Sequence, residues 1–208
     1  MAPGRLVAFE GGEAAGKSTQ AALLAERLGA VLTFEPGATR TGEVVRRHLL
    51  DPDAPLLAPR AETLLVLADR AQHCWEQVRP ALAGGRWVVT DRFSGSTLAY
   101  QGHGLGMELP VLQELCDWAS SGTWPDLTVL LTVEPAEAAR RLAVSRPDRI
   151  EARDQEFHRK VAEGYLQLAS GSPESWVVVD GSGPASGVAS AVADAVTARL
   201  GWPEGASR

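Results

Sequence analysis

The chain has 208 residues, a length typical of one compact domain, and its formal net charge is −6. This acidic balance argues against a general nucleic-acid-binding protein, because such proteins are usually basic. Hydrophobic residues make up 45% of the chain, and no apolar run approaches the length of a transmembrane helix. The first apolar run begins almost at the N-terminus, so we expect no signal peptide and a cytoplasmic protein without a membrane partner.

Strands and helices are predicted to alternate along the chain. Short apolar runs indicate buried strands at Arg5–Glu10, Ala30–Phe34, Arg86–Thr90, Leu127–Val133 and Trp176–Val179. Helical periodicity predicts helices over Lys17–Leu28, Thr41–Leu50, Arg60–Ala83, Leu109–Ser121, Ala136–Val144, Asp154–Ala169 and Gly187–Leu200. The alternation predicts a three-layer α/β fold with a five-stranded parallel sheet, in a single domain over residues 1–208. Pro52–Pro55 and Gly102–Gly104 are typical of loops.

The stretch from Gly11 to Ser18 has the pattern Gly-x-x-x-x-Gly-Lys-Ser between the first predicted strand and helix. This is the pattern of a P-loop, in which glycines let backbone N–H groups face phosphate oxygens at a helix N-terminus. We expect Lys17 to reach the β- and γ-phosphates of ATP and the Ser18 hydroxyl to bind Mg²⁺. The residues predicted to bind ATP are Gly11, Gly12, Glu13, Ala14, Ala15, Gly16, Lys17, Ser18 and Thr19.

Asp91 and Arg92 follow the third predicted strand, at the sheet edge where sites of α/β folds lie. Asp91 beside the P-loop is suited to hold Mg²⁺ or its water, and Arg92 supplies a fork that matches phosphate. The alternative is a structural ion pair at a strand end. With a P-loop in the same fold, we favour the functional interpretation.

Five arginines lie between the fourth predicted strand and the helix that contains Tyr165: Arg140, Arg141, Arg146, Arg149 and Arg153. One interpretation is a solvated helix and loop. The other is a mobile lid at about residues 145–154, whose arginines close on the transferring phosphoryl group. The charge pattern alone leaves both open.

Other polar and sulfur residues indicate structure rather than chemistry. By spacing alone, Asp69 and Arg70 are typical of a solvated helix face. Cys74 and Cys116 lie in apolar helical patterns, which indicates buried thiols in a reducing compartment. The four histidines have no metal-binding spacing.

Taken together, several blocks resemble the bacterial thymidylate kinase family, in the family's order and over almost the whole chain. The blocks are Phe9–Gln20, Glu35–Thr39, Ala68–His73, Asp91–Phe93, Ser96–Gly102, Pro147–Glu151 and Gly164–Leu166. The P-loop alone is shared by many enzymes, whereas the ordered set is specific. The resemblance implies a P-loop nucleoside monophosphate kinase fold, a homodimer, and phosphorylation of dTMP to dTDP with ATP and Mg²⁺.

The resemblance also implies residue roles. Arg92 would clamp the 5′-phosphate, Arg70 would bind thymine, and Tyr100 would pack under the deoxyribose. The implied substrate-binding residues are Glu13, Phe34, Pro36, Arg46, Val66, Arg70, Arg92, Thr97, Tyr100 and Gln101. Because Ala14 and Ala15 leave the P-loop without an arginine, the implied catalytic residues are Lys17, Arg92 and the lid arginines Arg146, Arg149 and Arg153.

The chain departs from the family pattern near the base pocket. Val66 stands where the family usually has an aromatic ring, and Leu105 replaces a frequent arginine. A kinase for another or a modified pyrimidine deoxynucleotide is therefore an alternative. A nucleotide-binding module without catalysis is a further alternative, disfavoured by the intact Lys17, Ser18 and Arg92.

Overall fold

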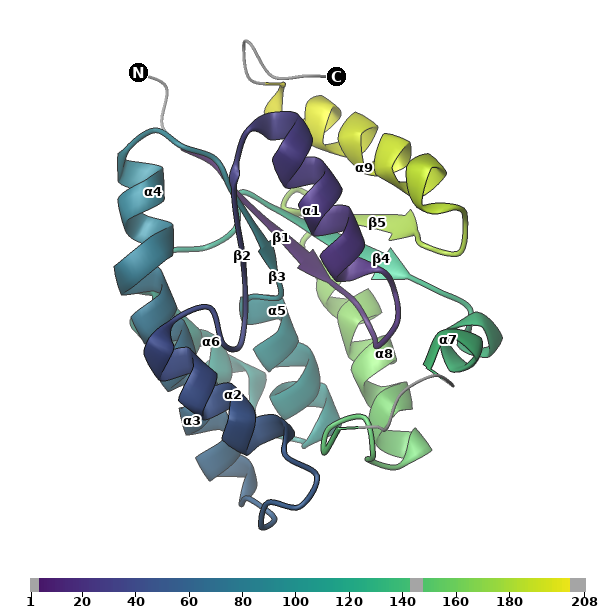
Figure 1. The fold of residues 1–208 in the computed structure, drawn as a ribbon. Coiled ribbons are helices and arrows are strands. Elements are labelled where there is room, and N and C mark those ends of the chain that lie inside the picture. The colour runs from purple at the N-terminus through teal and green to yellow at the C-terminus, as the bar shows by residue number, and fades with distance from the viewer. Residues whose placement is uncertain (1–3, 143–147, 203–208) are drawn as a thin grey trace.

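The computed structural model describes residues 4–142 and 148–202 and has a parallel sheet at its centre (Figure 1). The strands are β1 (Leu6–Glu10), β2 (Val31–Phe34), β3 (Val88–Asp91), β4 (Leu127–Thr132) and β5 (Trp176–Asp180). They pair in the order β2-β3-β1-β4-β5, and every pairing is parallel. The predicted five-stranded parallel sheet is confirmed.

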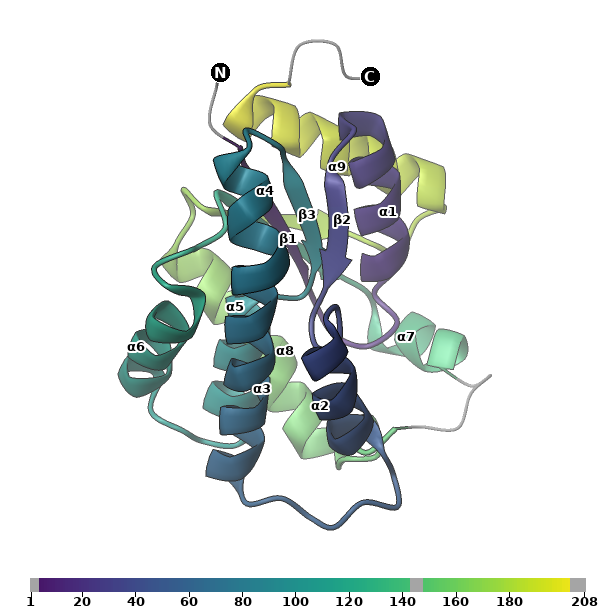
Figure 2. The ribbon, with the colours of Figure 1, turned by 60° about the vertical axis from the view of Figure 1, so that its left-hand side comes forward.

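Helices cover both faces of the sheet (Figures 1 and 2). They are α1 (Lys17–Leu28), α2 (Arg40–Leu50), α3 (Pro59–His73), α4 (Arg79–Ala83), α5 (Ser94–Thr97), α6 (Leu109–Ser120), α7 (Pro135–Leu142), α8 (Gln155–Gly171) and α9 (Ala185–Leu200). Two further segments are π-helical, η1 (Cys74–Val78) and η2 (Leu98–Gly104). Among the described residues, no helix combines the length and the apolar character needed to cross a membrane.

Alternate residues of β1 enter two different cores, because successive side chains of a strand point to opposite faces. Val7 and Phe9 pack with α1 and α9, for example against Leu24. Leu6 and Ala8 pack on the other face with η1 and α4. All five residues of β1 are fully buried, so the strand that leads into the P-loop is held on both sides. This is the predicted three-layer arrangement.

The predicted helix over Arg60–Ala83 is helical throughout, but it is not one α-helix. It consists of α3, the π-helical turn η1 and α4. Pro80 lies just after η1 and has no backbone N–H, so it removes one helical hydrogen bond at that point. A local change of helical hydrogen bonding is the usual accommodation of such a break.

The prediction of a loop at Gly102–Gly104 is wrong, because these residues belong to η2. The whole helical segment from Ser94 to Gly104 was missed by the sequence analysis. Gly102 and Gly104 allow close packing, because a larger residue at either position would overlap a neighbouring helix. A Cβ on Gly102 would lie 2.5 Å from Leu109, and one on Gly104 would lie 2.5 Å from Phe157. Helix η2 therefore packs directly against α6 and α8, which composition alone does not reveal.

Candidate active site

The P-loop connects β1 to α1 and is built around unusual backbone conformations. Gly11 has φ 147°, and a Cβ there would lie 2.4 Å from the Leu131 carbonyl oxygen. Ala14 has φ 56°, a region that non-glycine residues rarely adopt. Lys17 is buried, and its Nζ donates to the Gly12 carbonyl at 2.6 Å. Burial and the charge of Arg92 lower the pKa of Lys17 to about 8. The buried Lys17 amine is thus held against the backbone of its own loop.

Ser18 and Asp91 meet beside the P-loop, as the sequence predicts for a Mg²⁺ site. Asp91 ends β3 and pairs in register with Phe9 of β1, which brings it next to the loop. The Ser18 hydroxyl donates to Asp91 Oδ2, and Asp91 Oδ1 is buried with no hydrogen-bond partner. One hydroxyl and one carboxylate fit Mg²⁺, which takes its remaining ligands from phosphates and water. In the described part of the chain, no cluster of three or more His, Cys, Asp or Glu side chains could hold a metal.

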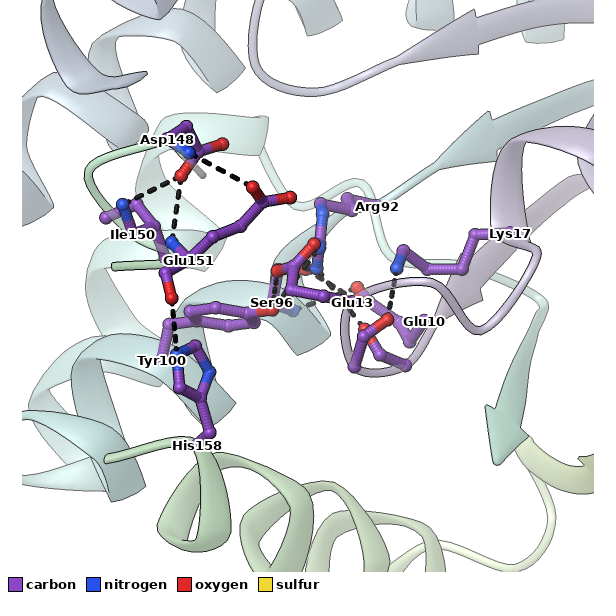
Figure 3. Close-up of polar contacts among 12 residues, drawn as sticks. Glu10, Glu13, Lys17, Arg92, Ser96, Tyr100, Asp148, Ile150, Glu151 and His158 are labelled. Atoms are coloured by element: carbon purple, nitrogen blue, oxygen red, sulfur yellow. Dashed lines mark hydrogen bonds and ion pairs between the residues drawn. The ribbon is translucent and has the colours of Figure 1, made fainter. Parts of the chain in front are cut away.

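Arg92 lies at the centre of the polar contacts in Figure 3, directly after β3 and with φ 72°. Its Nη2 donates to Glu13 Oε1 at 2.9 Å and to the Tyr100 hydroxyl at 3.2 Å. Its Nη1 donates to Ser96 Oγ at 3.1 Å and to the Tyr165 hydroxyl at 3.4 Å. The Tyr100 hydroxyl in turn donates to Glu13 Oε1 at 2.5 Å. The guanidinium is therefore fixed on both of its terminal nitrogens at the mouth of the P-loop.

Glu13 is the anionic partner of this guanidinium. Burial alone would raise its pKa, but the positive charges of Arg92 and Lys17 outweigh burial and hold the pKa at about 2. The ionised Glu13 therefore stabilises the fold above its ordinary pKa of 4.5, and this contribution is lost as the pH falls from 4.5 through 2.

We expect the Glu13→Gln variant to unfold at a lower temperature than the wild type near neutral pH, because Arg92 loses its charge partner. The difference in Tm should shrink at about pH 3, because the carboxyl is then protonated in the unfolded chain, so that unfolding takes up a proton and the ion pair contributes less. Thermal unfolding followed by circular dichroism across this pH range measures the difference. A Tm difference that stays constant with pH would contradict the ion pair.

Glu10, which sequence reasoning did not single out, anchors the backbone around Arg92. Its buried carboxylate accepts hydrogen bonds from Phe93 N at 2.9 Å, Ser96 N at 2.9 Å and Ser96 Oγ at 2.6 Å. The Tyr165 hydroxyl donates to it at 2.9 Å. Complete burial raises the pKa of Glu10, against the lowering effect of these hydrogen bonds and of Arg92. Glu10 thus ties the end of β1 to the turn that presents Arg92.

Arg70 and Asp69 are buried, so the solvated helix face expected from their spacing is wrong. Glu35, directly after β2, accepts from Arg70 Nε at 2.9 Å and pairs with Arg70 Nη2 at 2.8 Å. Arg70 Nη1 donates to Thr97 Oγ1 at 2.9 Å. Asp69 Oδ1 accepts from the Gly37 N–H at 2.9 Å. These partners are distant in sequence, so helix periodicity could not show them.

One cavity of about 790 Å³ joins the P-loop to the Arg70 end of the site. It is lined by most of the predicted ATP and substrate residues, including Glu13, Ala14, Ala15, Gly16, Lys17, Ser18, Thr19, Phe34, Pro36, Arg46, Val66, Arg70, Asp91, Arg92, Thr97, Tyr100 and Gln101. Gly11 and Gly12 are not among its described lining residues. Arg46 donates to the Pro36 carbonyl at 2.8 Å, and its guanidinium carbon lies 5.7 Å from the Phe34 ring centre.

Of the predicted lid arginines, Arg146 lies outside the described residues. Arg149 donates to the Leu49 carbonyl at 2.9 Å, and Arg153 pairs with Glu62 at 2.5 Å. These contacts hold the segment at α2 and α3, and neither arginine lines the described cavity. The catalytic role of the three arginines stays a prediction.

Arg141 on α7 is a cavity-lining residue that sequence reasoning placed only in a basic cluster. It donates to the Ala14 carbonyl at 3.1 Å and to the Gly181 carbonyl at 3.1 Å. Glu137, one helical turn earlier, pairs with its Nε at 2.7 Å. The guanidinium thereby bridges the P-loop and the segment after β5, a contact that depends on the tertiary fold.

Comparison with known proteins identifies the family. The family model described as thymidylate kinase matches residues 9–192. Thymidylate kinase of Thermomicrobium roseum is 45% identical over 198 residues, which cover 92% of this chain and 93% of that protein. That of Deinococcus radiodurans is 44% identical, with 88% and 92% covered. The crystal structure of thymidylate kinase from Ehrlichia chaffeensis is 30% identical, has a TM-score of 0.79, and is matched over 93% of this chain and 100% of that chain. The P-loop nucleoside monophosphate kinase fold is thereby confirmed, and the chain belongs to the thymidylate kinase family.

Proposed function

We propose that this chain transfers the γ-phosphoryl group of ATP to the 5′-phosphate of dTMP and releases dTDP and ADP. The observation that carries the proposal is that one cavity is lined by Lys17 and Ser18 of the P-loop, by Arg92 and by Arg70. A kinase for another pyrimidine deoxynucleotide is not favoured, because the relatives above are all thymidylate kinases.

The reaction needs no general base, because the acceptor is already a phosphate anion. Catalysis then rests on positioning and on neutralising the charge of the two phosphate groups. Lys17 and the P-loop N–H groups hold the donor, and Arg92 holds the acceptor through a planar fork. Glu13 and Tyr100 already fix this guanidinium, so little reorganisation accompanies binding.

Ser18 and Asp91 are proposed to hold Mg²⁺ at the donor phosphates. Held by these two residues, Mg²⁺ would offset the negative charge that develops on the donor phosphates. The lid of this single domain is proposed to lie at about residues 145–154, of which 145–147 are outside the described residues, with Arg146, Arg149 and Arg153 closing on the transferring phosphoryl group. Arg141 is proposed to contact ATP beside the P-loop, since it bridges Ala14 and Gly181.

The metal proposal predicts a specific defect in the Asp91→Asn variant. We expect the Mg²⁺ concentration for half-maximal turnover to rise by about tenfold or more, because the Ser18–Asp91 pair loses its negative charge. A magnesium titration at fixed ATP and dTMP measures the shift, and EDTA should abolish turnover of both proteins. An unchanged magnesium dependence would refute the assignment of Asp91.

The test of the function is ATP-coupled turnover with a panel of nucleoside monophosphates and Mg²⁺. We expect dTMP to be the best acceptor, ahead of deoxyuridylate and deoxycytidylate. Preference for a different pyrimidine nucleotide would mean that the cavity with Val66 has a changed specificity. No turnover with any acceptor would overturn the enzyme assignment.

A homodimer is proposed to form through α3, η1 and α6, in line with the resemblance. Leu64 and Trp75 are 61% and 67% exposed on the α3–η1 helix, and Val111 and Trp118 are 45% and 79% exposed on α6. The two helices lie side by side (Figure 2), so exposed apolar side chains of both are proposed to contact a second copy. Free, buried Cys74 and Cys116 agree with the proposed cytoplasmic location.

The dimer proposal predicts that Trp118→Arg converts the protein to a monomer. Sedimentation equilibrium should give twice the 22.1 kDa chain mass for the wild type and the single mass for the variant. The exposed Val44→Arg variant on α2 is the control and should remain dimeric. A wild type that sediments as a monomer would exclude the dimer.

A further inference from the structure

Glu62 is a buried carboxylate for which the proposed reaction has no role so far. It lies in the first turn of α3, and its side chain is 2% exposed. It shares one helix face with Val66 and Arg70, which follow at i+4 and i+8. All three line the cavity at the end where the base is proposed to bind.

The two oxygens of Glu62 take partners from two different parts of the site. Oε1 accepts from Gln101 Nε2 of η2 at 3.1 Å. Oε2 accepts from Arg153 Nη2 at 2.5 Å and lies 3.7 Å from Arg149 Nη2. One carboxylate therefore joins a proposed base contact to two of the predicted lid arginines.

The contact with Glu62 sets the orientation of the Gln101 amide. A carboxylate flanked by two guanidinium groups only accepts hydrogen bonds, so the amide nitrogen of Gln101 must face it. The carbonyl oxygen of Gln101 then faces away from Glu62. Gln101 lines the cavity, and within the described residues no donor is hydrogen-bonded to its Oε1. That oxygen is thus the amide atom left to meet a substrate.

We propose that Glu62 is a specificity-determining positioning residue, which holds the Gln101 amide so that its carbonyl oxygen faces the pyrimidine edge. Thymine and uracil carry an N3–H donor that suits this oxygen, whereas N3 of cytosine presents a lone pair that it repels. Discrimination against cytosine thus comes from a mismatch as well as from a favourable contact. This inference rests on the proposed function, because it concerns the acceptor of that reaction.

The Glu62→Gln variant tests the inference with little change of shape. In this variant the amide oxygen stays with Arg153, so the amide nitrogen faces Gln101 and favours the reversed orientation of the Gln101 amide. We expect the ratio of kcat/KM for dTMP over deoxycytidylate to fall by about tenfold, the value of one misplaced hydrogen bond. The ratio for dTMP over deoxyuridylate should stay unchanged, because both bases carry N3–H.

Two further variants separate this role from a structural one. Arg153→Gln removes the lid-side partner of Glu62 but leaves its contact with Gln101, so the dTMP over deoxycytidylate ratio should be kept even if turnover falls. Gln101→Met removes the amide and should lower the ratio by itself. In the Gln101→Met background, the Glu62→Gln change should have no further effect on the ratio.

The outcomes distinguish failure of the inference from failure of the proposed function. If the wild type does not phosphorylate dTMP, the proposed function fails. If the wild type does so and Glu62→Gln keeps its discrimination, the inference is overturned. If Glu62→Gln does not fold, Gln101→Met decides, because an unchanged ratio in that variant overturns the inference as well.

Discussion

Replacing Lys17 with methionine should lower turnover with ATP and dTMP by about a thousandfold, the scale expected when a preorganised charge is lost from a transferring phosphoryl group. Lys17 is 7% exposed, and its Nζ is held 2.6 Å from the Gly12 carbonyl inside the loop. A bound phosphate would therefore meet an amine already in place and largely desolvated. Methionine keeps the length of the side chain but not its charge.

The chain contains one other lysine, Lys160, which provides a matched control. Lys160 is 48% exposed on α8, where it lies 3.6 Å from Glu156. The Lys160→Met variant should keep wild-type turnover, and both variants should keep a cooperative thermal transition. If Lys17→Met retains a tenth or more of wild-type turnover (about 1.4 kcal/mol or less), the loop does not stabilise phosphoryl transfer as proposed.

Replacing Arg92 with lysine should lower kcat/KM for dTMP by about a hundredfold or more, although the formal charge is kept. Arg92 donates from both terminal nitrogens, to Glu13 and Tyr100 on one side and to Ser96 and Tyr165 on the other. A lysine ammonium is a single point and cannot hold both sets of partners while it also binds phosphate. The substitution should therefore lower kcat/KM for the acceptor, dTMP, more than it affects the use of ATP.

Steady-state kinetics with each substrate varied in turn separates the two halves of the site. We expect KM for ATP to change by no more than about twofold in Arg92→Lys, because the donor is held by the P-loop. Arg159→Lys, on the 54%-exposed Arg159 of α8, is the control for the same exchange on the surface. Equal losses toward ATP and dTMP would show that Arg92 supports the whole site and does not specifically clamp the acceptor.

Much of the donor side was predictable because its signals are local. The P-loop, its preceding strand and its following helix are continuous in sequence, and buried parallel strands appear as short apolar runs. The edge position of Asp91 and Arg92 follows from strand order, because the carboxyl ends of parallel strands meet at one edge. These features could be predicted from the order of residues along the chain alone.

The acceptor side depends on contacts between distant segments. Arg70 is buried because Glu35 supplies a counter-charge from another element, and Glu62 meets Gln101 only once α3 packs near η2. Spacing on a helix cannot distinguish such a buried charge from a solvated one. Arg141 and Glu10 were missed for the same reason, since each is defined by its partners and not by a local pattern.

The close packing of η2 also limits how this pocket can change over evolution. A Cβ at Gly102 or Gly104 would meet the Leu109 or the Phe157 side chain at 2.5 Å, so a larger residue at either position would push η2 away from α6 or α8. Helix η2 also carries Tyr100 and Gln101, which line the cavity, so such a substitution would displace both side chains. The shape of the pocket is therefore more readily altered by exchanging a cavity-facing side chain, such as Val66, than by replacing these glycines.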